Sequence, residues 1–126
     1  MAVTLASPGK GAQGNAPSGM GASSPQGSAG AALDEAMALE GVPSSWKHGL
    51  SFIVAQESGG KIGIQNPRDS ARGLFQLTAA NYHHNPNGAG SFGNAVQEVQ
   101  GGIRYIKERY GTADKAAQFW QDHHWY

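Results

Sequence analysis

The sequence contains no cysteine, which excludes disulfide bonds and thiolate metal sites and leaves the redox compartment open. Charge of one sign is also missing, because nine basic residues balance nine acidic ones. The chain therefore has no overall attraction for nucleic acid or for an anionic membrane. No hydrophobic run is long enough to span a membrane. The length of 126 residues suits one small domain rather than two.

Residues 1–30 are rich in Gly, Ser, Ala, Pro and Gln, with Lys10 as the single charge and no aromatic residue. Such a composition cannot bury enough hydrophobic surface to offset the entropy lost on ordering. We interpret this segment as a flexible tail or linker, either part of something longer or a terminus without a role of its own. Residues 31–126 then form the domain.

The domain shows helical spacing and little evidence for strands, which predicts a small, mainly α fold. Helices are expected over 31–41 and about 46–58, with Ser44 or Ser45 as the cap of the second. A short helix follows Thr78. A longer one opens at Ser91 or Asn94, and a last helix follows the cap Thr112. The strongest apolar stripe is that of the longer helix, formed by Val96, Val99, Ile103, Ile106 and Tyr110.

Glu57 stands at the end of the second helix and continues its apolar face, which is formed by Trp46, Leu50, Ile53 and Val54. Gly59 or Gly60 can end the helix in a left-handed conformation. Burial and the carbonyls of a helix C-terminus both disfavour a carboxylate, so we expect the pKa of Glu57 to be raised, as suits a general acid. The alternative is a solvated residue at a helix end.

Four landmarks occur in a characteristic order: Glu57-Ser58-Gly59-Gly60; then 71–78 (Ala-Arg-Gly-Leu-Phe-Gln-Leu-Thr); then 102–106 (Gly-Ile-Arg-Tyr-Ile); and the ending 120–126. Together they resemble the goose-type-lysozyme-like lytic transglycosylases (SLT-like domains), in particular the phage virion, tail or lysin type. The resemblance implies a lysozyme-like helical fold with a cleft for the glycan strands of peptidoglycan.

The resemblance also implies residue roles. Glu57 corresponds to the single catalytic acid/base, Ser58 to a serine near the substrate, and Gln76 to the glutamine that lines the cleft. The family's Ala-Tyr-Asn-x-Gly stretch, whose Tyr contacts the catalytic Glu, is replaced here by Ala117-Gln118-Phe119-Trp120-Gln121. Trp120 could stand in for that Tyr, and Tyr126 could supply a hydroxyl.

Aromatic residues suit a sugar cleft because they stack on sugar faces and hydrogen-bond at their polar edges. The candidates are Tyr82, Trp120, Trp125 and Tyr126, although Trp120 also lies on the core face of its helix, which favours packing. Tyr105 lies off the apolar stripe, which predicts a surface position, whereas Phe52 is predicted in the core.

Glycoside hydrolysis usually needs two carboxylates. Asp69 and Asp122 are the candidates for the second, but a turn and a solvated helix end explain them equally simply. A single-acid mechanism needs no second carboxylate, because the N-acetyl group of the substrate can stabilise the transition state.

We expect no metal and no cofactor. Histidines occur in two adjacent pairs, His83-His84 and His123-His124, but neighbouring side chains diverge on a helix and no His-Glu-x-x-His pattern is present. Solvated loop histidines are the simpler reading. No phosphate-binding glycine loop supports a nucleotide.

The favoured function is a peptidoglycan lytic transglycosylase that cleaves the MurNAc-GlcNAc bond. The alternatives are a hydrolytic muramidase, a cross-link endopeptidase on the same fold, or a non-catalytic cell-wall-binding module. The predicted partner is the glycan strand, with a larger virion or secretion assembly as a further possibility. Action in the periplasm or cell wall is expected. The N-terminus lacks the apolar core of a signal peptide, which points to virion association or release at lysis.

Overall fold

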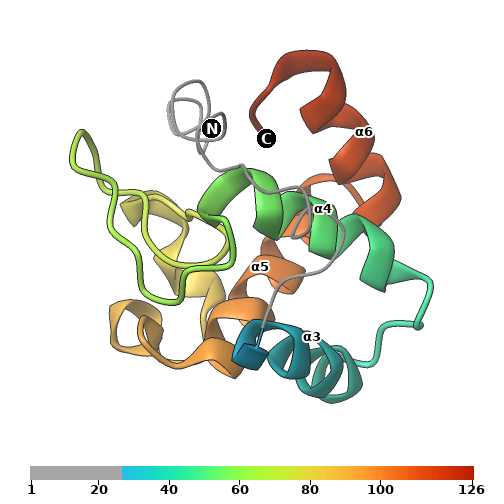
Figure 1. Ribbon diagram of the computed structural model, residues 1–126, viewed down its shortest axis with the longest axis horizontal. Coiled ribbons are helices and arrows are strands. Elements are labelled where there is room, and N and C mark those ends of the chain that lie inside the picture. Colours follow the sequence, from blue (N-terminus) through green and yellow to red (C-terminus); the bar gives the residue numbers. More distant parts are fainter. Residues whose placement is uncertain (1–26) are drawn as a thin grey trace.

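The computed structural model describes residues 27–126, and these fold mainly into helices. Figure 1 shows how these helices are arranged, with the loop that follows residue 58 extending to one side and returning. Within the described range there are no strands, only the isolated bridges Gln65–Arg72 and Arg72–Leu77. The prediction of a small, mainly α domain is therefore confirmed. The bounds are α3 Gly27–Glu40, α4 Trp46–Ser58, α5 Ala95–Arg109 and α6 Ala113–His123, with the 3₁₀ helices η3 Ala79–His84 and η4 Gly88–Ser91 between α4 and α5.

The first described helix begins earlier than the sequence predicts. α3 starts at Gly27, within the segment assigned to the tail, and Ala29 is only 2% exposed. Its buried face is formed by three alanines, Ala29, Ala32 and Ala36, together with Leu33 and Met37. Because alanine and glycine dominate the start of this helix, its composition resembles that of a flexible tail, and the sequence analysis placed the helix start too late. The rest of the tail prediction falls on residues 1–26, outside the described part of the chain.

Helix caps agree with the sequence at three ends and differ at two. Asn94 and Thr112 cap α5 and α6, their side chains accepting from Gln97 N and Lys115 N. Gly59 ends α4 with φ 65°, and its N–H donates to carbonyls of the last turn. Ser45 and Thr78 stand at N-caps but make no side-chain cap bond.

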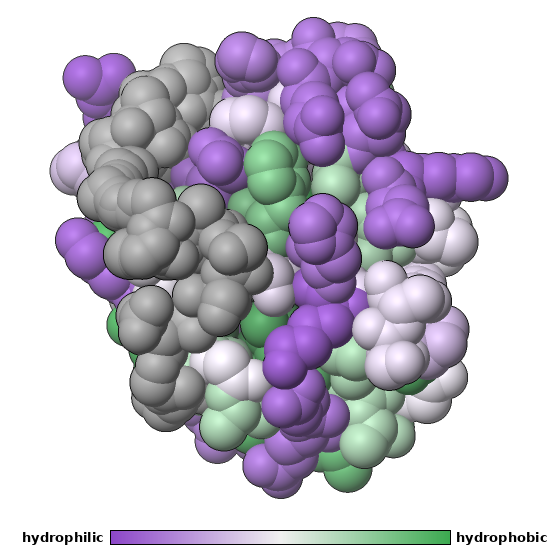
Figure 2. Space-filling view, turned by 45° about the vertical axis from the view of Figure 1, so that its right-hand side comes forward, coloured by the Kyte–Doolittle hydropathy of each residue, from purple (hydrophilic) through white to green (hydrophobic). Residues whose placement is uncertain are grey.

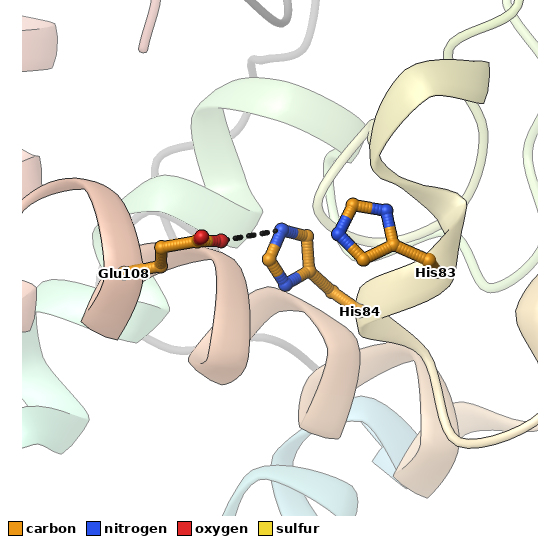
Figure 3. Close-up of side chains that lie close together, drawn as sticks. All are labelled: His83, His84 and Glu108. Atoms are coloured by element: carbon orange, nitrogen blue, oxygen red, sulfur yellow. Dashed lines mark ion pairs between the residues drawn. The ribbon is translucent and has the colours of Figure 1, made fainter.

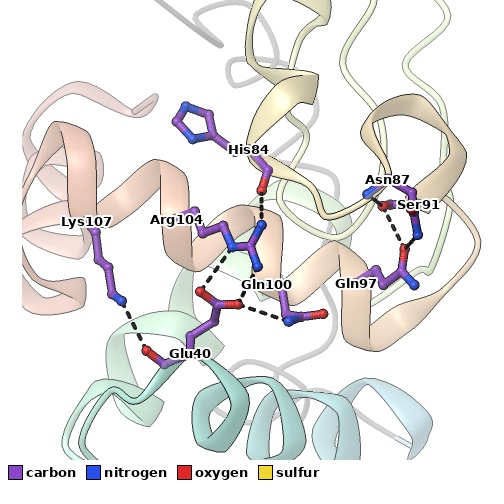
Figure 4. A network of polar contacts seen from close by, with 8 residues as sticks. All are labelled: Glu40, His84, Asn87, Ser91, Gln97, Gln100, Arg104 and Lys107. Carbon is purple, nitrogen blue, oxygen red and sulfur yellow. Dashed lines mark hydrogen bonds and ion pairs between the residues drawn. The ribbon is translucent and has the colours of Figure 1, made fainter.

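Arg104 of α5 joins α3 and η3 to this helix (Figure 4). Its Nε and Nη2 donate to the two carboxylate oxygens of Glu40 at 3.0 and 2.9 Å, and Gln100 Nε2 adds a third bond at 2.9 Å. The hydrogen bonds from Arg104 hold the pKa of Glu40 below its ordinary value. Arg104 Nη1 also donates to His84 O. A fork-shaped donor on a carboxylate fixes geometry as well as charge, so this network sets the position of α5.

Residues 73–76 form a tight turn that rests on the side of α5. Gly73 O accepts from Gln76 N at 3.1 Å, and Arg72 and Leu77 exchange two backbone hydrogen bonds. The buried carboxylate of Glu98 accepts from Leu74 N at 2.7 Å and from Gly93 N at 2.6 Å. The ring of Phe75 lies directly over Gly102. The carboxylate of Glu98 therefore binds the turn, and the absence of a side chain at Gly102 lets the ring of Phe75 pack on α5.

The surface is mixed in character, as the neutral charge suggests. Figure 2 shows hydrophilic residues around smaller hydrophobic areas on one face. Leu39 and Ile62 are the large hydrophobic side chains that are exposed in the described range. In residues 27–126 no helix combines the length and the hydrophobicity that a membrane span requires.

Replacing Gly102 with alanine should destabilise the domain. A Cβ at this position would lie 2.3 Å from the ring of Phe75. Overpacking of this kind costs about 1–3 kcal/mol, which outweighs the gain of about 1 kcal/mol from replacing glycine in a helix. Urea unfolding measures the difference. Gly90→Ala is the matched control, because its Cβ would meet only Asn87 at 3.9 Å. Equal stability of the two variants would contradict the close packing of the turn on α5.

Candidate active site

Glu57 lies in the last turn of α4 and is almost completely buried, with 1% of its surface exposed. Leu50, Ile53 and Val54 on the same helical face are fully buried, so the carboxylate does continue an apolar stripe. Burial removes water from the carboxylate and disfavours its charged form. The sequence prediction of a buried Glu57 is confirmed, and the solvated helix-end alternative is wrong.

Trp120 of α6 reaches this carboxylate. Its indole Nε1–H donates to Glu57 Oε2 at 2.8 Å, although the two residues are 63 positions apart. The indole is itself held by a T-shaped contact with Phe52 and by stacking on His124. Trp120 therefore makes the contact with Glu57 that the sequence analysis suggested, while also packing in the core as the alternative reading expected.

Close packing of α4 on α6 makes this reach possible. Gly49 of α4 lies against Ala113 at the start of α6, where a Cβ would come within 2.7 Å of the Ala113 carbonyl oxygen. About two turns further along both helices, Glu57 meets Trp120. The absence of a side chain at Gly49 thus allows α4 and α6 to pack closely from Gly49 and Ala113 to Glu57 and Trp120.

The C-terminal residue closes the site on another side. Tyr126 is fully buried, and its hydroxyl donates to Phe75 O of the turn at 2.8 Å. Tyr105 Oη in turn donates to Tyr126 O at 3.1 Å. Burial raises the pKa of the Tyr126 phenol well above its ordinary value, and the negative charge of Glu57 raises it further. The chain end therefore lies within the electrostatic reach of Glu57 and is fastened to the turn beside Gln76.

Gln76 and Ser58 use their side chains to hold the backbone around the site. Gln76 is 1% exposed and adopts a left-handed backbone with φ 52°, rare for a residue other than glycine. Its Nε2 donates to Ile64 O and Gly73 O. Ser58 Oγ donates to Val54 O and accepts from Gly60 N, and the residue is 6% exposed. Contact of either residue with substrate stays a prediction.

Tyr82 and Trp125 are half-buried at the edge of the packed interior. The Tyr82 hydroxyl donates to Ser70 O, and its ring meets Phe92 edge-on. Trp125 contacts Phe119 in the same manner. Their proposed stacking on sugars also stays a prediction.

Both candidates for a second carboxylate have structural partners. Asp69 Oδ1 accepts from Ala71 N at 2.8 Å, which forms the local turn expected of this residue. The exposed Asp122 accepts from Gln118 Nε2 one turn earlier on α6. These contacts favour the structural reading of each.

Two aromatic positions differ from the sequence analysis, and one acidic residue was missed. Tyr105, predicted at the surface, is 3% exposed, because α5 packs on more than one side. Phe52 is only half-buried, against the core.

Glu98 resembled an ordinary acidic residue in the first turn of a helix, and nothing local signalled its bonds to Leu74 and Gly93.

The comparison with protein families decides the assignment. A model of the transglycosylase SLT domain matches residues 36–125, a range that contains Glu57, the 73–76 turn and Trp120. The chain belongs to this family. The SLT domain family consists of lytic transglycosylases acting on peptidoglycan, so this SLT domain is an enzyme of cell-wall degradation. Neither the curated proteins nor the solved structures gave a significant match.

Trp120→Phe should destabilise the SLT domain more than Trp46→Phe, which serves as the matched change of a buried tryptophan. Both variants keep an aromatic ring, but only the first removes a donor from a buried carboxylate. Hydrogen bonds to charged groups contribute about 1.5–3 kcal/mol. Urea unfolding of the two variants, and of each combined with Glu57→Leu, which has no acceptor, measures the coupling between indole and carboxylate. A coupling free energy near zero would contradict the interaction.

Stability should fall as pH rises above about 10, the unperturbed pKa of tyrosine. Burial raises the pKa of Tyr126 in the folded state, so above pH 10 the unfolded chain loses protons that the folded chain keeps. The free energy of unfolding must then decrease with pH. Denaturation curves between about pH 9 and 11 should show a smaller decrease in Tyr126→Phe. Identical slopes in the two proteins would argue against a buried, protonated phenol.

Proposed function

We propose that this SLT domain cleaves the MurNAc-GlcNAc bond of peptidoglycan by lytic transglycosylation, with Glu57 as its single acid/base. The observation that carries the proposal is the buried carboxylate of Glu57 at the end of α4, oriented by the indole of Trp120 at 2.8 Å. A group that first gives and then takes a proton must be stable in both forms, and this environment contains influences in both directions.

These influences favour opposite forms of the carboxyl group. Burial and the nearby carbonyls of the helix end disfavour the negative charge, which keeps a proton available for the leaving oxygen. The indole N–H on Oε2 favours the negative charge, which steadies the carboxylate once the proton has gone. Their balance suits a residue that changes role within one turnover.

The proposed reaction has two steps. Neutral Glu57 protonates the glycosidic oxygen, and the bond to the muramic anomeric carbon breaks with an oxocarbenium-like transition state that the substrate's N-acetyl group can stabilise. Glu57, now a carboxylate, takes the proton of the muramic C6 hydroxyl as this oxygen bonds to the anomeric carbon. The product is an anhydro-muramic end, and no water is consumed.

A one-carboxylate mechanism also agrees with the state of the other acids. Asp69 and Asp122 are engaged in a local turn and along α6, and Glu98 holds the 73–76 turn. Ser58, Gln76, Tyr82, Trp120 and Tyr126 are the residues proposed for the substrate side of the site. Location in a virion, a lysis system or a secretion assembly is a further proposal that rests on the sequence resemblance.

Glu57→Gln tests the proposal. The amide keeps the size of the side chain and an oxygen that can accept from Trp120, so the fold should survive. Without a titratable carboxyl group at this position, the rate of fragment release from purified sacculi should fall by at least about 100-fold, the lower end of general acid–base contributions. Circular dichroism and urea unfolding confirm that the variant folds.

Asp69→Asn and Asp122→Asn are the matched controls, because each removes one carboxylate of similar size and keeps the local hydrogen bond. Both should release fragments at nearly the wild-type rate. Full activity of Glu57→Gln would refute the proposal. A large loss in Asp69→Asn instead would indicate a two-carboxylate hydrolase.

A further inference from the structure

Away from Glu57, two histidines and one glutamate come together between η3 and α5. His83 and His84 end η3, and Glu108 lies in the last turn of α5 (Figure 3). Each offers one potential ligand atom, and these atoms all lie within 4.8 Å of one another. His84 Nε2 lies 3.1 Å from Glu108 Oε1.

The two imidazoles do not diverge as the sequence analysis expected of neighbours on a helix. Their centroids are 4.2 Å apart, with 35° between the ring planes. His83 Nδ1 lies 3.1 Å from Ala80 O, which fixes the proton on Nδ1 and leaves Nε2 as the lone-pair atom. The backbone of His84 is held by Arg104, and its ring rests edge-on against Tyr105. Both rings are therefore oriented by contacts outside the cluster.

A pocket of about 350 Å³ accompanies the cluster. Its walls include all three potential ligands, together with Asn81, Tyr105 and Arg109. The space is large enough for an ion with one or more water molecules. The cluster is thus open on one side, as a site with three protein ligands and a water requires.

We propose that His83, His84 and Glu108 form a binding site for a divalent cation of the zinc type. Two imidazole nitrogens and one carboxylate oxygen are a donor set that zinc takes, with a water as fourth ligand. At zinc–ligand distances of about 2.0–2.2 Å, tetrahedral ligand atoms lie roughly 3.3 Å apart. Any separation longer than this must shorten when the ion binds, which rotation of the exposed side chains of His83 and Glu108 allows.

The charged groups around the pocket act on a bound cation in both directions. Burial lowers the pKa of His84, and the neighbouring His83 adds to the effect, whereas Glu108 acts in the opposite direction. Among the nearby cations, Arg104 is already paired with Glu40. Arg109 lines the pocket and opposes the bound cation.

A bound ion would cross-link η3 to the end of α5. Tyr105 forms part of the pocket wall, and its hydroxyl binds the backbone of Tyr126. A bound ion would therefore restrain the part of α5 around Tyr105, which contacts Tyr126 and, through Tyr126, the 73–76 turn. This proposal does not rest on the role of Glu57, and binding is measured without any activity assay.

The test is calorimetric titration of Zn²⁺ into the full chain without a histidine tag. Wild-type protein should bind one ion, and zinc should raise its melting temperature. His83→Ala and Glu108→Gln should each weaken binding by at least about tenfold, as loss of a ligand requires. Both residues are exposed, so these variants should fold normally, which circular dichroism checks.

Two controls make the result specific. His48→Ala removes an exposed histidine from α4, and His123→Ala removes one member of the other adjacent pair. Both should bind zinc as the wild type does. The absence of binding to the wild type, unchanged binding in His83→Ala and Glu108→Gln, or loss of binding in His123→Ala would each overturn the proposal.

Discussion

A single carboxylate buried at the end of a helix is the constraint on which this structure depends. Burial of Glu57 is costly unless a donor meets it, and the donor comes from the far end of the chain, in Trp120. To supply it, α6 must lie close along α4, which Gly49 permits. The position of α6 then leads the last three residues back toward the turn, where Tyr126 binds Phe75 O.

The opposite side of the site is built on α5. Glu98 fixes the backbone at Leu74, and Gly102 leaves room for the ring of Phe75, so the turn that carries Gln76 is held by its neighbours on both sides. Arg104 fastens α3 and η3 to the same helix. One helix therefore supports the turn and the outer elements, while α4 and α6 supply the carboxylate and its donor. Because different helices carry these two functions, the buried carboxylate of Glu57 is held in place by rigid secondary structure.

Much of this arrangement follows from the sequence, and the exceptions have physical causes. The stripe that ends in Glu57, the caps Asn94 and Thr112, and the glycine stop at Gly59 are local signals, and the structure agrees with them. The start of α3 was missed because small residues give a weak hydrophobic pattern. The positions of Tyr105, Glu98 and the ring of His84 depend on contacts between distant segments, which no local pattern encodes.

The nature of the products tests the central claim most directly, because it distinguishes an acid/base that closes a ring from one that activates water. Purified sacculi digested by the full chain are to be analysed by mass spectrometry in ¹⁸O-labelled water. The account predicts fragments that end in anhydro-muramic acid and carry no label. Reducing muramic ends with incorporated label would mean hydrolysis, and intact glycan with cut cross-links would mean peptide cleavage. Either result would contradict the assignment of Glu57 as the single group that completes the reaction without water.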